Sequence, residues 1–344
     1  MIHRHSRFPM RRAATDAVVS IAICSLLTAY ALQAHAQAAT ATAPSSAKSV
    51  TAEFPPELVH WSAWHGNPIF TAEGPDHWDV KIRERGWILR DGDSYQLWFT
   101  GYDGTRQGIK LLGYATSHDG IHWMLSPKNP IYRKHWVEDM SVVRYGNRYY
   151  MFAEGAHQNH AEMLTSPNGV DWKWEGELDV RLSDGKQPAP KPCGTPTVWV
   201  ENDRWYLFYE YLDRGAWLAT TKDPMSRVWT NVQDDPVLRP GPGPFDRDMI
   251  AIDQIIKYSG AYFAFYHGSG SGVAMPRTWN TDIARSTDLI HWQKYSGNPI
   301  VDDNKSSGIV VPMITPGTAA HGFRLYTMHD RVDLFVSVPG SKRP

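Results

Sequence analysis

The stretch SHDGIHWMLSPKNPIY, residues 117–132, recurs along the chain and sets its organisation. A His-Trp pair is followed by Asn-Pro-Ile, with the His and the Asn seven residues apart, at His60 and Asn67, at His122 and Asn129, and at His291 and Asn298. Two weaker copies lie between the second and the third, TSPNGVDWKW around Trp172 and TTKDPMSRVWTN around Trp229. A spacing of about fifty to sixty residues is typical of blade-type repeats.

A short aromatic phrase alternates with the first one. Its copies are YQLWFTG (95–101), YYMFAEG (149–155), WYLFYEY (205–211), YFAFYHG (262–268) and FRLYTMH (323–329). Each copy follows a polar turn and an apolar segment, which indicates a β-hairpin. One unit is therefore two hairpin strands, a third strand, the His-Trp turn and a fourth strand. Five such units predict an all-β fold, a five-bladed β-propeller of four-stranded antiparallel blades.

The two ends of the predicted propeller complement each other. The fifth unit runs out near Val338 without a His-Trp phrase, whereas the phrase at His60 stands ahead of the first unit. We therefore expect this N-terminal segment to supply the outer strand of the last blade. Residues 57–340 then form a single catalytic propeller domain.

The N-terminal residues have the pattern of an export signal. Basic residues precede the apolar run 17–32, and Ala34-His35-Ala36 offers the small residues that signal peptidase reads. Residues 1–36 are predicted to be a signal peptide cleaved after Ala36, and residues 37–56 a disordered lead-in. The mature protein is then periplasmic or extracellular and is not held at a membrane. Cys193 alone would remain of the two cysteines, so no intrachain disulfide is expected.

Composition restricts the class of partner. The 344 residues include 42% hydrophobic side chains, enough for a large core. Lys and Arg (35) nearly balance Asp and Glu (36), so no long-range field steers the protein to nucleic acid or to an anionic membrane. The expected partner is a small molecule that is neutral or carries only local charge, and the oligomeric state is left open.

A propeller brings particular residues to one mouth of its central channel. The first strand of each blade lines the channel and starts at the mouth where the antiparallel second strand ends. Glu84 and Glu138 stand eleven residues before Tyr95 and Tyr149, at two such starts. The side chains expected at this mouth are Arg83, Glu84, Arg85, Glu138, Asp139, Glu154, Glu210, Asp253, His267, Lys305 and His329. The set is rich in carboxylates.

Over residues 58–338 the chain resembles the clan of five-bladed propeller glycoside hydrolases that includes families 43, 32, 68, 117 and 130. The resemblance rests on VEDMSVV (137–143), on GTPTVWVENDRWYLFYE (194–210) and on the DG-x-HW turns. VEDMSVV looks like the Asp-Pro-x-Val element that opens the second blade in that clan, with Met140 in place of the Pro. Gly194 stands where families 32 and 43 commonly carry their acid Glu. The exact family is not assigned.

The resemblance implies a secreted, family 43-like glycosidase. Such an enzyme needs one protonated carboxyl for the leaving oxygen and one carboxylate for water or the anomeric carbon, and crowding of carboxylates separates their pKa values. By blade position, the resemblance implies Glu84 as base, Asp139 as modulator or substrate-binding carboxylate, and Glu210 as acid. His267 competes with Glu210, because family 117 is taken to use a His. The substrate-binding candidates are Arg83, Arg85, Glu138, Glu154, Asp253, His267, Lys305 and His329.

Other interpretations stay open. Glu84 could instead form an ordinary ion pair with Arg83 or Arg85 at a strand end. Glu154 and Glu210 could instead be solvated loop carboxylates. SHDGIHW resembles the sialidase Asp-box, although the Gly follows the Asp directly and the repeats number five rather than six, and a non-catalytic carbohydrate-binding propeller is a further alternative. The recurring histidines belong to separate outer turns, too far apart to share an ion. No cofactor is required, and a structural calcium ion in the central channel is left open.

Overall fold

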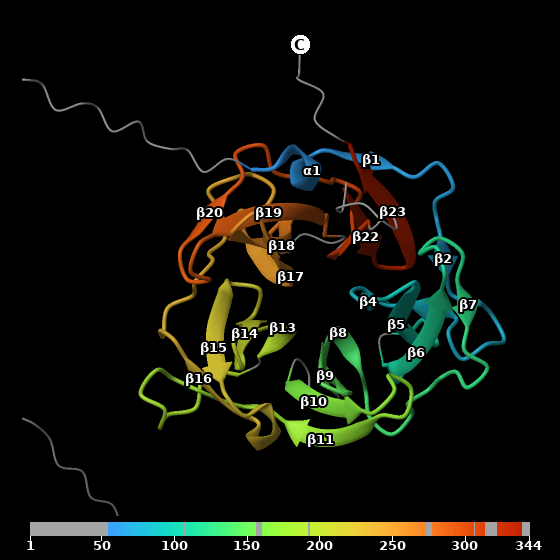
Figure 1. The fold of residues 1–344 in the computed structure, drawn as a ribbon, viewed down its shortest axis with the longest axis horizontal. Helices are drawn as coiled ribbons and strands as arrows, with labels where there is room; N and C mark the ends of the chain where they lie inside the picture. Colours follow the sequence, from blue (N-terminus) through green and yellow to red (C-terminus); the bar gives the residue numbers. More distant parts are fainter. Residues whose placement is uncertain are drawn as a thin grey trace, which may run out of the picture. The chain divides into compact units, whose positions relative to one another are not determined.

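The computed structural model describes residues 54–105, 107–155, 160–191, 193–272, 277–305, 307–313 and 322–338. The predicted signal peptide and its cleavage site lie outside these residues. The described residues form an all-β fold of five small sheets arranged as a propeller (Figure 1). Among them, no helix has the length and apolar character that crossing a membrane requires. The predicted fold class is confirmed.

Blades 1 to 3 follow one another along the chain. Blade 1 contains β3 (Lys81–Ile82), β4 (Trp87–Asp91), β5 (Ser94–Tyr102), β6 (Leu111–Ser117) and β7 (Met124–Leu125). Blade 2 contains β8 (Glu138–Tyr145), β9 (Arg148–Glu154), β10 (Ala161–Ser166) and β11 (Lys173–Glu177). Blade 3 contains β13 (Gly194–Glu201), β14 (Arg204–Glu210), β15 (Ala216–Thr221) and β16 (Val228–Asn231), and β12 (Asp179–Arg181) adds a parallel outer strand beside β16. The short helix η1 (Pro224–Ser226) precedes β16.

Blades 4 and 5 complete the ring. Blade 4 contains β17 (Met249–Tyr258), β18 (Ala261–Ser269), β19 (Asn280–Ser286) and β20 (Trp292–Lys294). Blade 5 contains β21 (Gly308–Pro312), β22 (Phe323–Met328) and β23 (Arg331–Ser337). The inner strands contact one another in the order β4, β8, β13, β17, β21 and back to β4. The first strand of every blade therefore faces the axis, as predicted.

The N-terminal segment closes the ring. After the short helix α1 (Pro56–Val59), β1 (Trp61–Ala63) pairs antiparallel with β23, and β2 (Phe70–Thr71) pairs with the same strand farther along. Figure 1 shows this blue segment beside the red C-terminal strand. The predicted outer strand of the last blade is confirmed.

The repeated Asn-Pro-Ile phrase fastens the outer part of a blade to its third strand. Asn129 bonds through its side-chain amide to both the N–H and the C=O of Tyr114 in β6, at 2.9 and 3.0 Å. Asn298 does the same to Ile283 in β19, at 3.0 and 3.1 Å. Asn67 does so to Leu334 in β23, at 2.8 and 2.9 Å. Each amide thus replaces the backbone pairing that a neighbouring strand would give.

The polar residues of the same phrase build the turn. The Asp119 carboxylate accepts backbone N–H groups of the turn and lies 2.7 Å from Nδ1 of His122, and Asp288 and His291 repeat the arrangement. The His122 and His291 side chains are 87% and 85% exposed. These histidines are turn residues on the outside of separate blades.

The aromatic strands supply much of the buried core and of the contacts between blades. Trp98 of blade 1 is fully buried and donates its indole N–H to the carbonyl of Gly169 in blade 2, at 2.7 Å. Tyr326 of blade 5 donates to the carbonyl of Gly120 in blade 1, at 3.1 Å. Packing and buried hydrogen bonds thus connect neighbouring blades without a disulfide.

Asn67→Ala tests the closure of the ring. The substitution leaves an N–H and a C=O of β23 unpaired, so the free energy of unfolding is expected to fall by about 1–3 kcal/mol in denaturant titrations. Asn298→Ala, which removes the equivalent clamp inside blade 4, is the matched control. Both variants should lose stability, but only Asn67→Ala should speed amide hydrogen exchange in β1 and β23. Unchanged exchange there in Asn67→Ala would contradict the closure role.

Candidate active site at the channel mouth

Irregular backbone at the starts of the inner strands positions the site. The ladder register shifts between Glu138 and Ser141 in β8, and between Gly194 and Thr197 in β13. Inside these bulges Asp139 and Thr195 have φ values of 47° and 44°. Bulges redirect side chains, and non-glycine residues with positive φ are held there by their surroundings. In blade 1 residues 83–86 likewise interrupt the ladder between β3 and β4.

Arg85 lies at the centre of these irregular segments and is fully buried. Its guanidinium donates to the Thr197 hydroxyl at 2.6 Å and to the Pro196 carbonyl at 2.7 Å. It also donates to the backbone carbonyl of Asp139 and, at 3.3 Å, to that of Ile252. A side chain of blade 1 thus binds the backbones of blades 2, 3 and 4. Arg85 was predicted to bind substrate, but its burial places it beneath the site as a support.

Glu154 and Glu210 lie at the ends of β9 and β14, as the sequence predicted, and are only 8% and 3% exposed. Glu154 accepts the Thr195 N–H at 2.7 Å, and Glu210 accepts the Asp213 N–H at 2.5 Å. A Cβ on Gly194 would lie 1.9 Å from a Glu210 oxygen and 2.9 Å from a Glu154 oxygen. Both carboxylates therefore lie against Gly194. These two glutamates therefore fill the space beside Gly194, the position at which families 32 and 43 commonly carry their acid Glu.

Burial makes this carboxylate group retain protons. Burial, reinforced by the nearby Glu210, raises the pKa of Glu154 to about 8. Burial, reinforced by Asp213, raises the pKa of Glu210 to about 7. Burial, reinforced by Glu154 and Glu84, raises the pKa of Asp139 well above its usual range, and Oδ1 of Asp139 has no hydrogen-bond partner among the described residues. Loss of hydration and repulsion between like charges both disfavour the ionised forms.

Glu84 lies in a different electrostatic environment at the same mouth. Its carboxylate is 2.6 Å from the Arg83 guanidinium and 3.3 Å from Nδ1 of His329. Arg83 also pairs with Glu138, which accepts the Trp136 indole N–H at 2.7 Å. The ion pair between Glu84 and Arg83 that the sequence left as an alternative is present.

His267 and Asp253 form a buried pair in blade 4. Nδ1 of His267 is 2.8 Å from Asp253, and the imidazole edge faces the Trp279 ring at 5.1 Å between centroids. Burial alone would lower the pKa of His267, but the Asp253 and Asp213 carboxylates outweigh it and raise that pKa. This raised pKa favours the protonated imidazole that a competing acid would need.

Among the described residues, one group of carboxylates at the mouth could hold a metal ion. Glu84, Glu138 and Asp139 each offer an oxygen, and these three oxygens lie within 4.8 Å of one another. Arg83 already pairs with two of the three carboxylates. The positive charge that a calcium ion would supply is thus partly provided by a side chain.

Two features of the mouth differ from what the sequence indicated. Lys305 is buried and pairs with Asp333 at 3.0 Å and with Asp303 at 3.8 Å, so its described contacts lie within blade 5. Asp213, which was not predicted, bonds to Glu210 and is 3.7 Å from the Arg277 guanidinium. Asp213 stands three residues past the end of β14. Including the loop that follows each second strand among the candidates would have found this residue.

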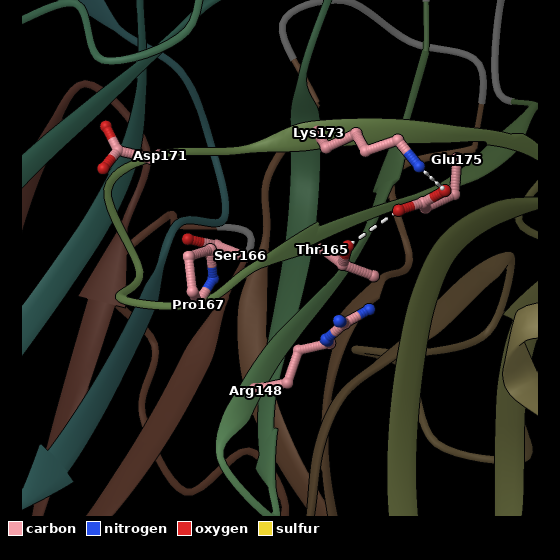
Figure 2. Close-up of a pocket in the computed structure, with 7 residues that line it drawn as sticks. All are labelled: Arg148, Thr165, Ser166, Pro167, Asp171, Lys173 and Glu175. Carbon is pink, nitrogen blue, oxygen red and sulfur yellow. Dashed lines mark hydrogen bonds and ion pairs between the residues drawn. The ribbon is translucent and has the colours of Figure 1, made fainter.

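A surface hollow of about 250 Å³ lies on the outer part of blade 2, lined by Arg148, Thr165, Ser166, Pro167, Asp171, Lys173 and Glu175. Figure 2 shows that Glu175 lies between Thr165 and Lys173, which bond to it at 2.8 and 2.9 Å. Burial of Glu175 is outweighed by these bonds, so its pKa is lowered. The hollow therefore lacks a proton-retaining carboxyl, whereas the channel mouth has several.

Glu154→Gln tests the buried carboxylate group. The folded state holds the Glu154 proton up to a pH near 8, whereas the ordinary value is 4.5, so the free energy of unfolding should decrease as pH rises between these values. The amide should flatten this dependence and raise stability at pH 8 by at least about 1 kcal/mol relative to wild type. Denaturant unfolding at pH 5 and pH 8 measures it, with Glu175→Gln in the same blade as the control. A larger alkaline loss in Glu154→Gln than in wild type would contradict the assignment.

Comparison with known sequences gives distant relatives only. No family model matches the chain. Two uncharacterized proteins of Mycobacterium tuberculosis are 21% identical over 217 residues and 25% identical over 128 residues, covering 61% and 33% of this chain. The chain spans 53% and 40% of the lengths of these relatives.

Comparison with solved structures gives the architecture. A Parabacteroides distasonis protein provisionally assigned as a glycoside hydrolase has a TM-score of 0.64 at 14% identity, over 83% of this chain and 97% of that one. A Listeria innocua β-1,2-mannobiose phosphorylase bound to β-1,2-mannobiose has a TM-score of 0.58 at 14% identity, over 81% and 96%. A structure from family 130, described as mannoside phosphorylases that include hydrolases of β-1,2 mannosidic linkages in Candida mannan, has a TM-score of 0.59 at 15% identity, over 83% and 96%. The predicted resemblance to five-bladed propeller glycoside hydrolases is confirmed as a resemblance of fold, and the family stays unassigned.

Proposed function

We propose that the protein is an exported glycoside hydrolase that cleaves glycosidic bonds of an oligo- or polysaccharide at the channel mouth. One observation carries the proposal: the buried carboxyls of Glu154 and Glu210, whose pKa values are raised, share a mouth with Glu84, which is paired with Arg83. Acetal hydrolysis needs this pair of environments, one carboxyl that stays protonated and one that stays ionised. A carbohydrate-binding propeller without catalysis has no need of such a split.

The residues divide the reaction as follows, in a family 43-like arrangement. Glu210 donates its proton to the glycosidic oxygen while the bond to the anomeric carbon breaks. Glu84, held by Arg83 and His329, acts as the base and receives the proton of the water that attacks that carbon. Asp139 retains its own proton beside them and orients the sugar. Glu154 lies beside Glu210 at Gly194, and burial with Asp213 keeps the acid protonated.

The partners of Arg83 and Arg85 favour hydrolysis over phosphorolysis. One similar structure is a β-1,2-mannobiose phosphorylase, and another comes from a family of mannoside phosphorylases that contains hydrolases, so inorganic phosphate is the competing acceptor to consider. A phosphate site requires cationic donors directed at the ligand. Arg83 is committed to two carboxylates and Arg85 to backbone carbonyls beneath the site. Water is therefore the proposed acceptor, and rates with and without phosphate distinguish the two reactions.

Substitution of Glu210 tests the acid. The mature protein is first screened against aryl glycosides and plant and microbial oligosaccharides to find a substrate. Glu210→Gln should then lower kcat by about 10²–10⁴-fold, since the amide cannot donate the proton, while substrate affinity in calorimetry is kept. Asp139→Ala should also lower kcat, and Glu175→Gln should not.

Parallel measurement of His267→Gln decides between the two acids. A loss of kcat confined to His267→Gln would transfer the role from Glu210 to His267. Wild-type turnover in both Glu210→Gln and Asp139→Ala would overturn the site. A graded loss of affinity, with no hydrolysis of any substrate by the wild type, would support a carbohydrate-binding protein instead.

The pH dependence of catalysis follows from the pKa of the acid. Glu210 must be protonated to act, and burial with Asp213 places its pKa at about 7. We therefore expect kcat/KM to fall as pH rises through about 7, and Glu210→Gln to lose this alkaline limb. A profile in which kcat/KM stays level from pH 6 to pH 9 would contradict Glu210 as the acid.

A further inference from the structure

Blade 4, the sheet of β17 to β20 in Figure 1, contains buried side-chain oxygen atoms apart from the carboxylates described above. Asn280 and Asp282 are two residues apart in β19, so their side chains share one face of the sheet. Asp282 is fully buried and Asn280 is 4% exposed. Both carboxylate oxygens of Asp282 and the amide oxygen of Asn280 have no hydrogen-bond partner among the described residues. The Asn280 amide nitrogen donates to the Phe245 carbonyl at 3.1 Å, which fixes the orientation of the amide.

Gly268 provides the space in which these oxygens meet. It is the cross-strand partner of Asn280, and Tyr266 is the partner of Asp282. A Cβ at Gly268 would lie 2.7 Å from Oδ2 of Asp282 and 2.8 Å from Cβ of Asp246. The Asp246 and Asp282 side chains therefore approach each other over the glycine, beside Asn280.

The donors of this group are unevenly shared. Asp246 is 4% exposed, and its Oδ2 accepts both the Lys294 ammonium and the Tyr266 hydroxyl. Both donors are thus used by Asp246, whereas the two carboxylate oxygens of the buried Asp282 have none among the described residues.

A proton alone does not satisfy the group. Protonation of Asp282 supplies one donor, whereas three buried oxygens lack a partner. Leaving buried acceptors unpaired is costly. A cation contacts several oxygens at once.

We propose that Asp282, Asn280 and Asp246 bind a divalent cation in blade 4. Carboxylate and amide oxygens, without nitrogen or sulfur, are the donors that Ca²⁺ and Mg²⁺ prefer, and the irregular arrangement of loop and strand suits the flexible coordination of Ca²⁺. The ion joins the loop of Asp246 to β18 and β19. Since β18 also carries His267, the site stabilises one wall of the channel mouth. It shares no residue with Glu84, Glu138 and Asp139.

Metal analysis and thermal unfolding of the mature protein test the site. Mass spectrometry of the wild type after dialysis against CaCl₂ should find a tightly held calcium ion that Asp282→Asn lacks. Removal of metal with a chelator and titration with CaCl₂ should raise Tm by about 5 °C at saturation in wild type. Asp282→Asn, which keeps the shape and removes the charge, should lose this shift, and Asn280→Ala should weaken calcium binding about tenfold or more. Glu138→Gln should keep the shift.

The outcomes separate the alternatives. A wild type without bound metal and without a Tm shift in Ca²⁺, Mg²⁺ or Mn²⁺ would overturn the proposal, and protons with water would then occupy the group. A shift that persists in Asp282→Asn and Asn280→Ala but disappears in Glu138→Gln would overturn it in favour of the channel carboxylates. The wild-type metal content decides the question even if Asp282→Asn fails to fold.

Discussion

The buried guanidinium of Arg85 is the interaction on which the rest of the structure depends. A buried charge is costly unless it is hydrogen-bonded, and the two terminal nitrogens of the Arg85 guanidinium donate to the backbone of three other blades. Its Nε has no hydrogen-bond partner among the described residues. The carbonyls that it binds belong to the segments where β8, β13 and β17 depart from regular pairing. Arg85 therefore holds the inner strands together and at the same time fixes the bulge that turns Asp139 into the channel.

The electrostatics of the mouth follow from this support. Arg85 binds backbone oxygens rather than the side chains of Glu154 and Glu210, so burial dominates the protonation of these two carboxylates. Glu84, in contrast, is directly paired with Arg83. One mouth thus contains buried carboxyls with raised pKa values and a carboxylate paired with an arginine, the two environments that the proposed acid and base need.

The sequence was sufficient for the architecture because the architecture is periodic. The spacing of the His-Trp and aromatic phrases gave the blade count, and the unmatched phrase at His60 gave the ring closure. The expectation that the second strand of each blade ends at the channel mouth also placed Glu154, Glu210 and His267 correctly on β9, β14 and β18. Each of these inferences depends only on position along a repeat, which a sequence displays directly.

The orientation of individual side chains could not be obtained in this way. Position along the repeat predicted Arg85 and Lys305 at the mouth, but bulges and interrupted strands decide where a side chain points. Arg85 bonds to backbone carbonyls beneath the site, and Lys305 pairs with Asp333. The sequence indicated that the acid Glu was missing at Gly194. It does not show that the Glu154 and Glu210 carboxylates occupy the space there. Asp213 and Trp136 lie in loops outside the repeated phrases. The proposed export signal lies outside the described residues and stays a prediction.

The central claim is that crowding and burial keep Glu154 and Glu210 protonated near neutral pH. Carbon-13 NMR of protein labelled at the glutamate carboxyl carbons measures this directly, with Glu154→Gln and Glu210→Gln to assign the two resonances. The account predicts that these resonances titrate with midpoints near 8 and near 7, well above the ordinary value of 4.5. Midpoints below about 5 for both carboxyls would contradict it.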